Sequence, residues 1–336
     1  MAILRFVENP GRIKGYLNDP DKKPLFQVIK ELVVLAMYKK EMPYYYFLHL
    51  YKKEVKNIKD FLSTKERALV RKDIVKKYEL VSILHNKLSF ALYCEIYNLK
   101  TPEPILYSLS NNYYYNKKVT TNINNRDLVI YIRDILKNES VDELFVRPLS
   151  LFGGTGCFKL TLDNLEATLE EQRESLQNGN YLFTKVVKQH PEINKIQEKS
   201  VNTIRMLTHV TDEGKISMLS AVMRFGVGDS VVDNSSAGGF YIPINLKEGT
   251  LMSKGWAKTD FGGERITHHP DSKFKLEGFK IPFYKESCEM VIEYTKYIPN
   301  KLIGWDVAIT PDGPTIIEAN DSPYLGLSDI GAGGLL

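Results

Sequence analysis

Two carboxylates near the end of the chain are placed to bind a cation. The sequence has two apolar runs there, 302–310 and 315–320, and the Pro-Asp-Gly-Pro between them favours a tight hairpin. With a three-residue loop, Asp306 lies opposite Glu318, and Asn320 shares their face. Like charges opposite each other destabilise a sheet, so we expect a cation between them, and carboxylate and amide oxygens suit Mg²⁺. The alternative is a surface hairpin whose acids point outward.

A glycine-rich loop at 149–156 joins two predicted antiparallel strands. Its glycines (Gly153, Gly154 and Gly156) let the backbone approach a ligand and direct N–H groups at phosphate oxygens. The loop is not a Walker A motif, and a strand rather than a helix follows it, which excludes the dinucleotide-binding fingerprint. Arg147 places a cation beside the loop. A phosphate-binding lid is one interpretation, and a flexible turn is the other.

Two arginines stand inside apolar strands, Arg205 in Asn-Thr-Ile-Arg and Arg224 in Ala-Val-Met-Arg. Arginine is rarely buried without an anionic partner, so each requires one. A structural ion pair would satisfy this requirement. Together with the acid pair and the glycine loop, however, the arginines favour a triphosphate or an acyl-phosphate as the partner. His268 and His269 lack further ligands at metal-site spacing and favour a loop role.

The composition limits the class of protein. A chain of 336 residues that is 43% hydrophobic can bury a core divided over two or three subdomains. Its three cysteines are far apart and form neither a disulfide framework nor a zinc motif, which predicts a reducing, cytoplasmic location. The apolar runs are too short to span a bilayer, and we expect no signal peptide.

The charge is unevenly distributed. Residues 1–80 hold 18 Lys and Arg against 10 Asp and Glu, although the whole chain carries only +4. This segment predicts a basic helical module that could contact an anionic membrane, an acidic polymer such as a glycan, or solvent alone. It has no zinc-ligand set and no RNA-binding signature, so we expect no nucleic-acid partner.

The elements that would position these groups alternate between helices and strands. A capping box at Ser63–Glu66 and an N-cap at Asn86 start two helices. Lys100–Pro104 begins a strand. The other predicted strands are 142–148, 157–162, 181–187, 203–210 and 215–225, and the other predicted helices are 164–175 and 282–297.

Taken in order, these segments resemble the ATP-grasp superfamily over residues 80–325, and most of all its branch associated with sugar transfer. The strongest pieces are Ser-Val-Asn-Thr-Ile-Arg ending at Arg205, Asp233-Asn234-Ser235 with Gly238-Gly239, Gly-Trp-Asp ending at Asp306, and Ile-Glu-Ala-Asn ending at Asn320. The basic N-terminal quarter lies outside this resemblance.

The resemblance implies a role for each matching position. The implied metal ligands, which hold Mg²⁺ against the ATP phosphates, are Asp306, Glu318 and Asn320. The implied nucleotide-binding positions are Lys87, Arg147, Gly153, Gly154, Gly156, Lys185, Val187 and Asn234. The implied catalytic positions are Arg205, Arg224 and Glu318. The sequence departs from the family pattern at Thr184, where a hinge acid is usual, and at Gly304, where some ligases place an arginine.

The implied fold is the α+β ATP-grasp fold, in which two α+β subdomains grip ATP between antiparallel sheets. The predicted domains are a helical N-terminal extension (1–80), a pre-ATP-grasp and lid segment (81–190) and a C-terminal subdomain with the metal and substrate site (191–336). The implied activity is an ADP-forming ligase that joins a carboxylate and an amine through an acyl-phosphate. By analogy, it would join an amino acid or amine to a sugar acid of a surface polysaccharide precursor. The alternatives are a kinase acting on a small molecule or glycan and a non-catalytic nucleotide-binding module.

Overall fold

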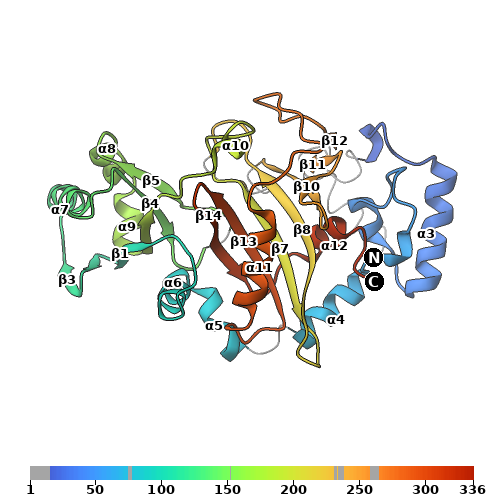
Figure 1. Ribbon diagram of the computed structural model, residues 1–336, viewed down its shortest axis with the longest axis horizontal. Helices are drawn as coiled ribbons and strands as arrows, with labels where there is room; N and C mark the ends of the chain where they lie inside the picture. The colour runs from blue at the N-terminus through green and yellow to red at the C-terminus, as the bar shows by residue number, and fades with distance from the viewer. Residues whose placement is uncertain (1–15, 75–77, 152, 231–232, 234–237, 258–264) are drawn as a thin grey trace. The chain divides into compact units, whose positions relative to one another are not determined.

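The computed structural model describes residues 16–74, 78–151, 153–230, 233, 238–257 and 265–336 (Figure 1). They form two compact units. The first takes its residues from 1–81, 189–314 and 319–336, and the second takes its residues from 82–188 and 315–318. The last long strand of the chain therefore contributes to both units.

The second unit is built on a six-stranded sheet in the order β3-β2-β1-β6-β4-β5, with antiparallel neighbours throughout. The strands are β1 (Pro104–Leu109), β2 (Asn112–Tyr115), β3 (Lys118–Thr121), β4 (Glu143–Pro148), β5 (Phe158–Thr161) and β6 (Asn180–Lys185). The helices that share a core with this sheet are α7 (Asn125–Asn138), α8 (Leu165–Glu171) and α9 (Arg173–Asn178).

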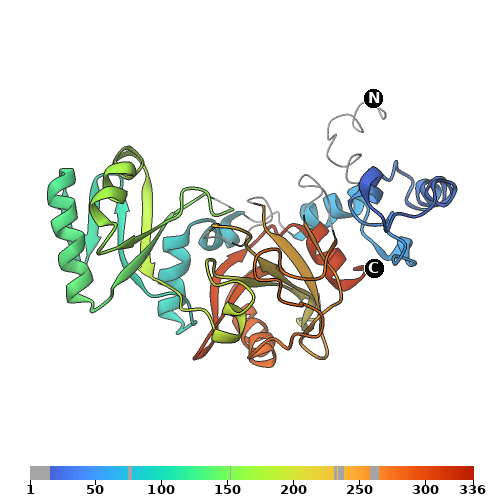
Figure 2. The ribbon, with the colours of Figure 1, turned by 90° about the horizontal axis from the view of Figure 1, so that it is seen from above.

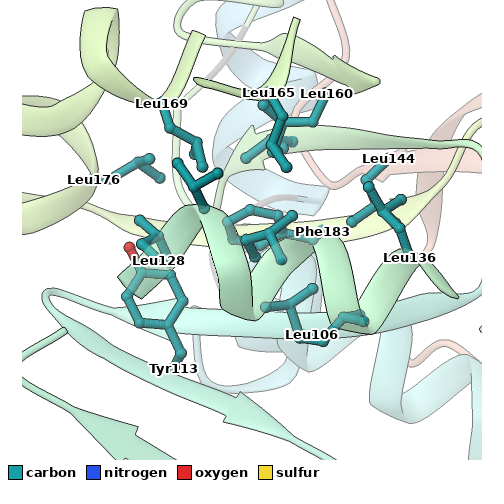
Figure 3. Packing of buried hydrophobic residues seen from close by; sticks show 14 of the residues in the cluster. Leu106, Tyr113, Leu128, Leu136, Leu144, Leu160, Leu165, Leu169, Leu176 and Phe183 are labelled. Atoms are coloured by element: carbon teal, nitrogen blue, oxygen red, sulfur yellow. The ribbon is translucent and has the colours of Figure 1, made fainter. Parts of the chain in front are cut away.

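Alternation along the strands decides which residues enter that core (Figure 3). Phe183 of β6 belongs to the cluster under α7, α8 and α9, whereas Leu182 belongs to a second cluster with Ala91 and Leu149. Successive strand residues point to opposite faces. Helix α6 (Lys87–Ile96), which contributes Ala91, therefore covers the face opposite α7.

The first unit is built on a larger sheet in the order β12-β11-β9-β8-β7-β13-β14, with β10 paired to β9. Its strands are β7 (Thr203–Val210), β8 (Ile216–Phe225), β9 (Phe240–Asn245), β10 (Thr250–Leu251), β11 (Gly255–Ala257), β12 (Arg265–Ile266), β13 (Leu302–Thr310) and β14 (Gly313–Asn320). A short helix, α10 (Pro191–Asn194), precedes β7.

Two helices mark the two faces of this sheet. On one face, the Trp305 indole N–H donates to Thr208 Oγ1 at 2.9 Å, and Thr208 meets Thr295 of α11 (Tyr284–Thr295). On the other face, Val222 lies against Gly331 of α12 (Leu325–Ala332), where an added Cβ would be 2.5 Å from Val222 Cγ1. Asp306 follows Trp305 and points to the α12 face.

The N-terminal part of the first unit has an apolar core of its own, made by α3 (Leu25–Lys39) with the 3₁₀ helices η1 (Tyr44–Leu48) and η2 (Ile58–Asp60). Helix α4 (Thr64–Ile74) begins with the predicted capping box, because Glu66 N–H donates to Ser63 Oγ and Ser63 N–H donates to the Glu66 carboxylate. Helix α5 (Tyr78–His85) follows and belongs to both units. None of the helices in the described ranges is long and apolar enough to cross a membrane.

Two predicted boundaries were wrong. The helix expected at 164–175 is divided into α8 and α9 at Gln172, whose φ of −91° and ψ of 6° break the helix, although Leu165, Leu169 and Leu176 keep helical spacing. The strand expected from Lys100 begins only at Pro104, because the Lys100 carbonyl instead accepts the Ile316 N–H at 2.9 Å.

Candidate functional site

In the first unit, Asp306 is held between two arginines. Arg205 of β7 lies directly opposite Asp306 of β13, and its Nε and Nη2 donate to the two carboxylate oxygens, the latter at 3.0 Å. Arg224 of β8, two residues from Val222 and on the same face, brings its Nη2 within 3.0 Å of Asp306 Oδ2. The two arginines that the sequence predicts to need an anionic partner therefore both form ion pairs with Asp306, the predicted metal ligand. This agrees with the interpretation of these arginines as members of a structural ion pair.

The ionisation of Asp306 follows from this geometry. The residue is only 4% exposed, and burial alone would raise its pKa. The charges of Arg205 and Arg224 and their hydrogen bonds outweigh that effect and hold the pKa below 3.8. Asp306 is thus a buried carboxylate kept ionised by two cations, on the sheet face that α12 borders.

Arg224 also contacts the hydroxyl of Thr203 and a second buried acid, Asp233. Thr203 Oγ1 accepts from Arg224 Nε at 3.1 Å and from Nη2 at 2.5 Å, and it donates to Asp233 Oδ2 at 2.5 Å. Asp233 also accepts the Thr203 N–H at 2.8 Å and lies 3.4 Å from Arg224 Nε. Burial raises the pKa of Asp233, although Arg224 and Thr203 act in the opposite direction.

Sequence reasoning missed Thr203. The signal available was its position two residues before Arg205, which places both side chains on one face of β7. Asp233 was named only as part of the Asp-Asn-Ser piece of the ATP-grasp resemblance. Asn234, the neighbouring predicted contact, lies outside the described residues.

Asn320 and Gly304 lie together beside this cluster. Asn320 Nδ2 donates to the Gly304 carbonyl at 3.2 Å, which leaves Oδ1 as the atom that can bind a metal. A Cβ at Gly304 would come within 2.6 Å of Pro323 Cβ. The glycine at this position is therefore a packing requirement, and an arginine side chain would not fit here.

In the second unit, Lys87 and Glu318 come together. Lys87 is the first residue of α6, and the Asn86 side chain caps the helix by accepting the N–H groups of Leu88 and Ser89. Lys87 Nζ lies 3.6 Å from Glu318 Oε1 and donates to the Leu151 carbonyl at 2.6 Å. The predicted phosphate-binding lysine thus contacts the predicted metal ligand at the base of the glycine loop.

Arg147 lies beside the same acid with hydrogen-bonding capacity unused. Its Nη1 donates to the Ile317 carbonyl at 3.0 Å, whereas its buried Nε has no partner in the described part of the chain. Burial lowers the pKa of Arg147 and the Glu318 charge raises it. A buried guanidinium with an unmet donor fits an anionic ligand such as phosphate.

The glycine loop adopts the predicted hairpin between β4 and β5. Gly153, Gly154 and Gly156 have φ values of 72°, 77° and 72°, a left-handed conformation that other residues rarely adopt. The Cys157 N–H closes the turn on the Gly154 carbonyl at 3.2 Å. These three glycines therefore serve the conformation of the loop, whichever ligand it contacts.

At the predicted adenine hinge, Thr184 is buried in β6, between β1 and β4. Lys185 follows it, donates its N–H to the Glu103 carbonyl at 3.0 Å and pairs with the Glu103 carboxylate at 2.6 Å. Sequence reasoning missed Glu103, which supplies an acid at the hinge where Thr184 does not. Val187 is half-buried just after β6.

His269 has a structural role. It is fully buried against the stacked rings of Phe225 and Phe240, and its Nε2 lies 3.0 Å from the Gly226 carbonyl. The Nδ1 atom of His268 forms a hydrogen bond of 3.1 Å with the Thr267 hydroxyl.

The donor atoms fit Mg²⁺ better than a softer metal. Among the residues that the structure describes, no three His, Cys, Asp or Glu side chains are grouped so that they could hold a metal ion by themselves. What the three predicted ligands offer is oxygen, from two carboxylates and one amide, which is the donor set of Mg²⁺ with phosphate and water completing its shell. Asp306 and Asn320 belong to the first unit and Glu318 to the second, so their joint binding of one ion stays a prediction.

The sequence of the chain matches a known protein family. Residues 71–336 match the family model described as sugar-transfer associated ATP-grasp, and this match confirms the predicted fold. No curated protein matches the sequence.

Several solved structures resemble the chain. D-alanyl-alanine synthetase A from Vibrio cholerae is 13% identical with a TM-score of 0.44, covering 76% of this chain and 60% of that one. Carboxyaminoimidazole ribonucleotide synthase from Aspergillus clavatus, complexed with ATP, is 10% identical with a TM-score of 0.46, covering 80% and 56%. The ATP-grasp ligase PsnB, complexed with Mg and ADP, is 13% identical with a TM-score of 0.41, covering 77% and 57%. The chain thus spans less than two thirds of each.

Proposed function

Since the chain belongs to the sugar-transfer associated ATP-grasp family, we propose that it is an ATP-dependent ligase that joins a carboxylate to an amine. The observation that carries this proposal is the cluster of Asp306 with Arg205 and Arg224. It places one ionised carboxylate and two fixed cations on a single sheet face. That set can bind both a metal ion and the phosphoryl group that the metal accompanies.

The reaction needs positioning and charge stabilisation rather than a protein nucleophile. The substrate carboxylate attacks the γ-phosphorus of ATP, the bond to the bridging oxygen breaks, and ADP leaves. An amine then attacks the acyl-phosphate carbon, phosphate leaves, and the amine nitrogen gives up a proton. Arg205 and Arg224 would stabilise the charge on the transferred phosphoryl oxygens in both steps.

The predicted metal ligands fit Mg²⁺ by their chemistry. Asp306, Glu318 and Asn320 Oδ1 would hold the ion, which when bound neutralises phosphate charge. Lys87 and Arg147 would bind the nucleotide phosphates, and the unpartnered Nε of Arg147 supports this role. The glycine loop that follows Arg147 would cover the phosphates with its backbone N–H groups.

For the substrate, we propose a sugar acid of a surface polysaccharide precursor, joined to an amino acid or amine. The support is the sugar-transfer association of the family. We also propose that the reaction takes place in the cytoplasm, and the support is the absence of disulfide bonds among the three cysteines. Residues 1–80 would contact an anionic surface, either membrane or glycan.

The first test is calorimetric titration of a non-hydrolysable ATP analogue, with and without Mg²⁺, into the wild type and Glu318→Gln. We expect Mg²⁺-dependent binding that the substitution weakens about tenfold or more, since it removes a charged ligand. Glu143→Gln is the matched control, because Glu143 lies in the same unit but pairs with Lys159 at the surface. If wild type and Glu318→Gln bound the ATP analogue with equal affinity in the presence of Mg²⁺, Glu318 would not be a metal ligand.

A second test separates ligase from kinase. ADP release is followed with candidate carboxylates and amines supplied singly and in pairs. A ligase consumes ATP productively only with both and forms an amide, whereas a kinase needs one acceptor and leaves phosphate on it. Turnover with one acceptor and a stable phosphorylated product would overturn the ligase proposal.

A further inference from the structure

Helix α3 carries large apolar side chains on a face that the described part of its unit does not cover. Leu25, Ile29, Val33 and Met37 recur every fourth residue, and Phe26 lies beside them, so they form one stripe along the helix. They are between 52% and 75% exposed. The opposite face carries Val28 and Leu35, which are buried in the core with η1 and η2. A helix that is apolar on both faces normally has a partner on each.

This stripe is continuous and lies outside the part of the chain that matches the ATP-grasp family. The helix lies at the margin of its unit, seen lengthwise in Figure 1 and nearly end-on in Figure 2. Just outside its ends, Leu17 is 59% and Met42 55% exposed. Exposed apolar surface of this extent usually marks an interaction site.

The charges around the stripe decide what kind of surface it fits. Residues 16–60 hold nine lysines against six acids, and four of the acids pair with a cation: Asp19 with Lys52, Asp21 with Arg265, Glu31 with Lys23 and Glu54 with Lys254. Glu41 and Asp60 accept hydrogen bonds from neutral groups. Lys30, on the edge of the stripe, and Lys40, at the end of α3, form no ion pair within the described ranges. The net charge of this segment is therefore positive, and Lys30 and Lys40 carry positive charge beside the apolar row.

We propose that α3 docks this protein on an anionic lipid bilayer, lying in the interface with Phe26, Ile29, Val33 and Met37 among the acyl chains. An interfacial helix of this kind combines an apolar stripe with lysines that attract anionic headgroups. Lys30 and Lys40 would supply that attraction. The inference rests on the proposed contact of residues 1–80 with an anionic surface and names its partner. It does not depend on the ligase reaction, because it uses residues outside the family match and needs no nucleotide.

The test is co-sedimentation of the full chain with vesicles of phosphatidylcholine alone or with 30% phosphatidylglycerol, a composition chosen to be strongly anionic. We expect binding to the anionic vesicles only. The triple substitution Phe26→Gln, Val33→Gln and Met37→Gln should reduce the partition coefficient about tenfold or more. Lys30→Gln with Lys40→Gln should weaken binding, and added salt should weaken it for the wild type.

The matched control replaces exposed apolar residues of the other unit: Leu92→Gln, Ile96→Gln and Val119→Gln, which are 43%, 75% and 53% exposed. This control should bind as the wild type does. Circular dichroism and ATP-analogue binding, measured on every variant, verify that each is folded. Vesicle binding that the α3 variant retains would overturn the proposal. So would a wild-type protein that ignores vesicles and forms a dimer in sedimentation analysis which the α3 substitutions dissociate, because a second copy would then cover the stripe.

Discussion

At the scale of single residues, the most consequential arrangement is a carboxylate whose charge is balanced before any ligand arrives. Asp306 is buried and both its oxygens accept from arginine. A metal ion at Asp306 and a phosphate at Arg205 and Arg224 would therefore replace an existing ion pair. Binding would exchange charge partners rather than bury new charges, which lowers the desolvation cost.

Asp306→Asn should destabilise the protein by about 3–5 kcal/mol, because it leaves two buried guanidinium groups facing a neutral amide. Urea unfolding at pH 7 measures the change in free energy. The matched control is Asp229→Asn, which breaks a fully exposed pair with Lys199 and should leave the free energy of unfolding nearly unchanged. Equal losses in the two variants would contradict the buried cluster.

The same residue predicts a pH dependence. The folded-state pKa of Asp306 lies below its unfolded value of 3.8, so its ionised form stabilises the native state fully above pH 3.8. That contribution is lost as the pH falls through the folded-state pKa. The stability difference between wild type and Asp306→Asn should therefore be constant from pH 5 to 7 and shrink below about pH 4. A difference that grows on acidification would contradict the assignment.

Arg147 gives a prediction about ligand binding. Replacing Arg147 with methionine keeps much of the apolar stem but removes the unpartnered Nε and the charge, so ATP-analogue affinity should fall about tenfold or more. Arg133→Met is the matched control, because Arg133 pairs with the exposed Glu166 in the same unit. Calorimetry on both variants measures the effect, and unchanged affinity for Arg147→Met would exclude Arg147 from phosphate binding.

At the scale of elements, local signals in the sequence were sufficient where the chemistry is local. The capping box at Ser63, the N-cap at Asn86 and the glycine hairpin depend on neighbours within a few residues, and each is confirmed. The contact of Asp233 with Thr203 joins residues 30 positions apart, and the contact of Gly304 with Pro323 depends on how the chain returns. Contacts between residues so far apart produce no periodic pattern in the sequence, so they could not be predicted from one sequence alone.

Asn86 allows the position of Lys87 to be tested through its helix. Asn86→Ala removes the side chain that caps α6 and should cost about 1 kcal/mol of stability. It should also weaken ATP-analogue binding, since Lys87 is the first residue of that helix. Asn124→Ala is the control, because Asn124 caps α7 in the same unit. The control should lose similar stability and keep its affinity.

At the scale of the whole molecule, residues distant in sequence stabilise the first unit. Asp329 of α12 is fully buried and accepts from Arg67 Nη2 at 3.0 Å, from the Leu62 N–H at 2.9 Å and from the Leu335 N–H at 3.1 Å. Burial raises the pKa of Asp329, and Arg67 acts against that rise. The Asp329 carboxylate therefore joins Arg67 and Leu62 of the N-terminal region to the C-terminal helix α12.

Arg67→Met should destabilise the first unit by about 3 kcal/mol, because it leaves the Asp329 carboxylate buried without its cation. Arg71→Met lies one turn further along α4 at an exposed position and should change stability by less than about 0.5 kcal/mol. Thermal unfolding of both variants provides the comparison. Similar midpoints for the two would argue that the Asp329 pair carries no stability.

The division of β14 has a consequence for how the protein is made. The second unit takes 82–188 from the middle of the chain and 315–318 from near its end, where Ile316 N–H bonds to the Lys100 carbonyl and the Ile317 carbonyl accepts from Arg147. A ribosome releases the chain from its N-terminus, so the sheet of this unit emerges well before the four residues that complete it. Arg147 therefore acquires its Ile317 partner, and Lys87 its Glu318 partner, only after residues 315–318 have emerged. A nascent chain stopped before residue 315 would hold most of the fold and none of the Glu318 contacts.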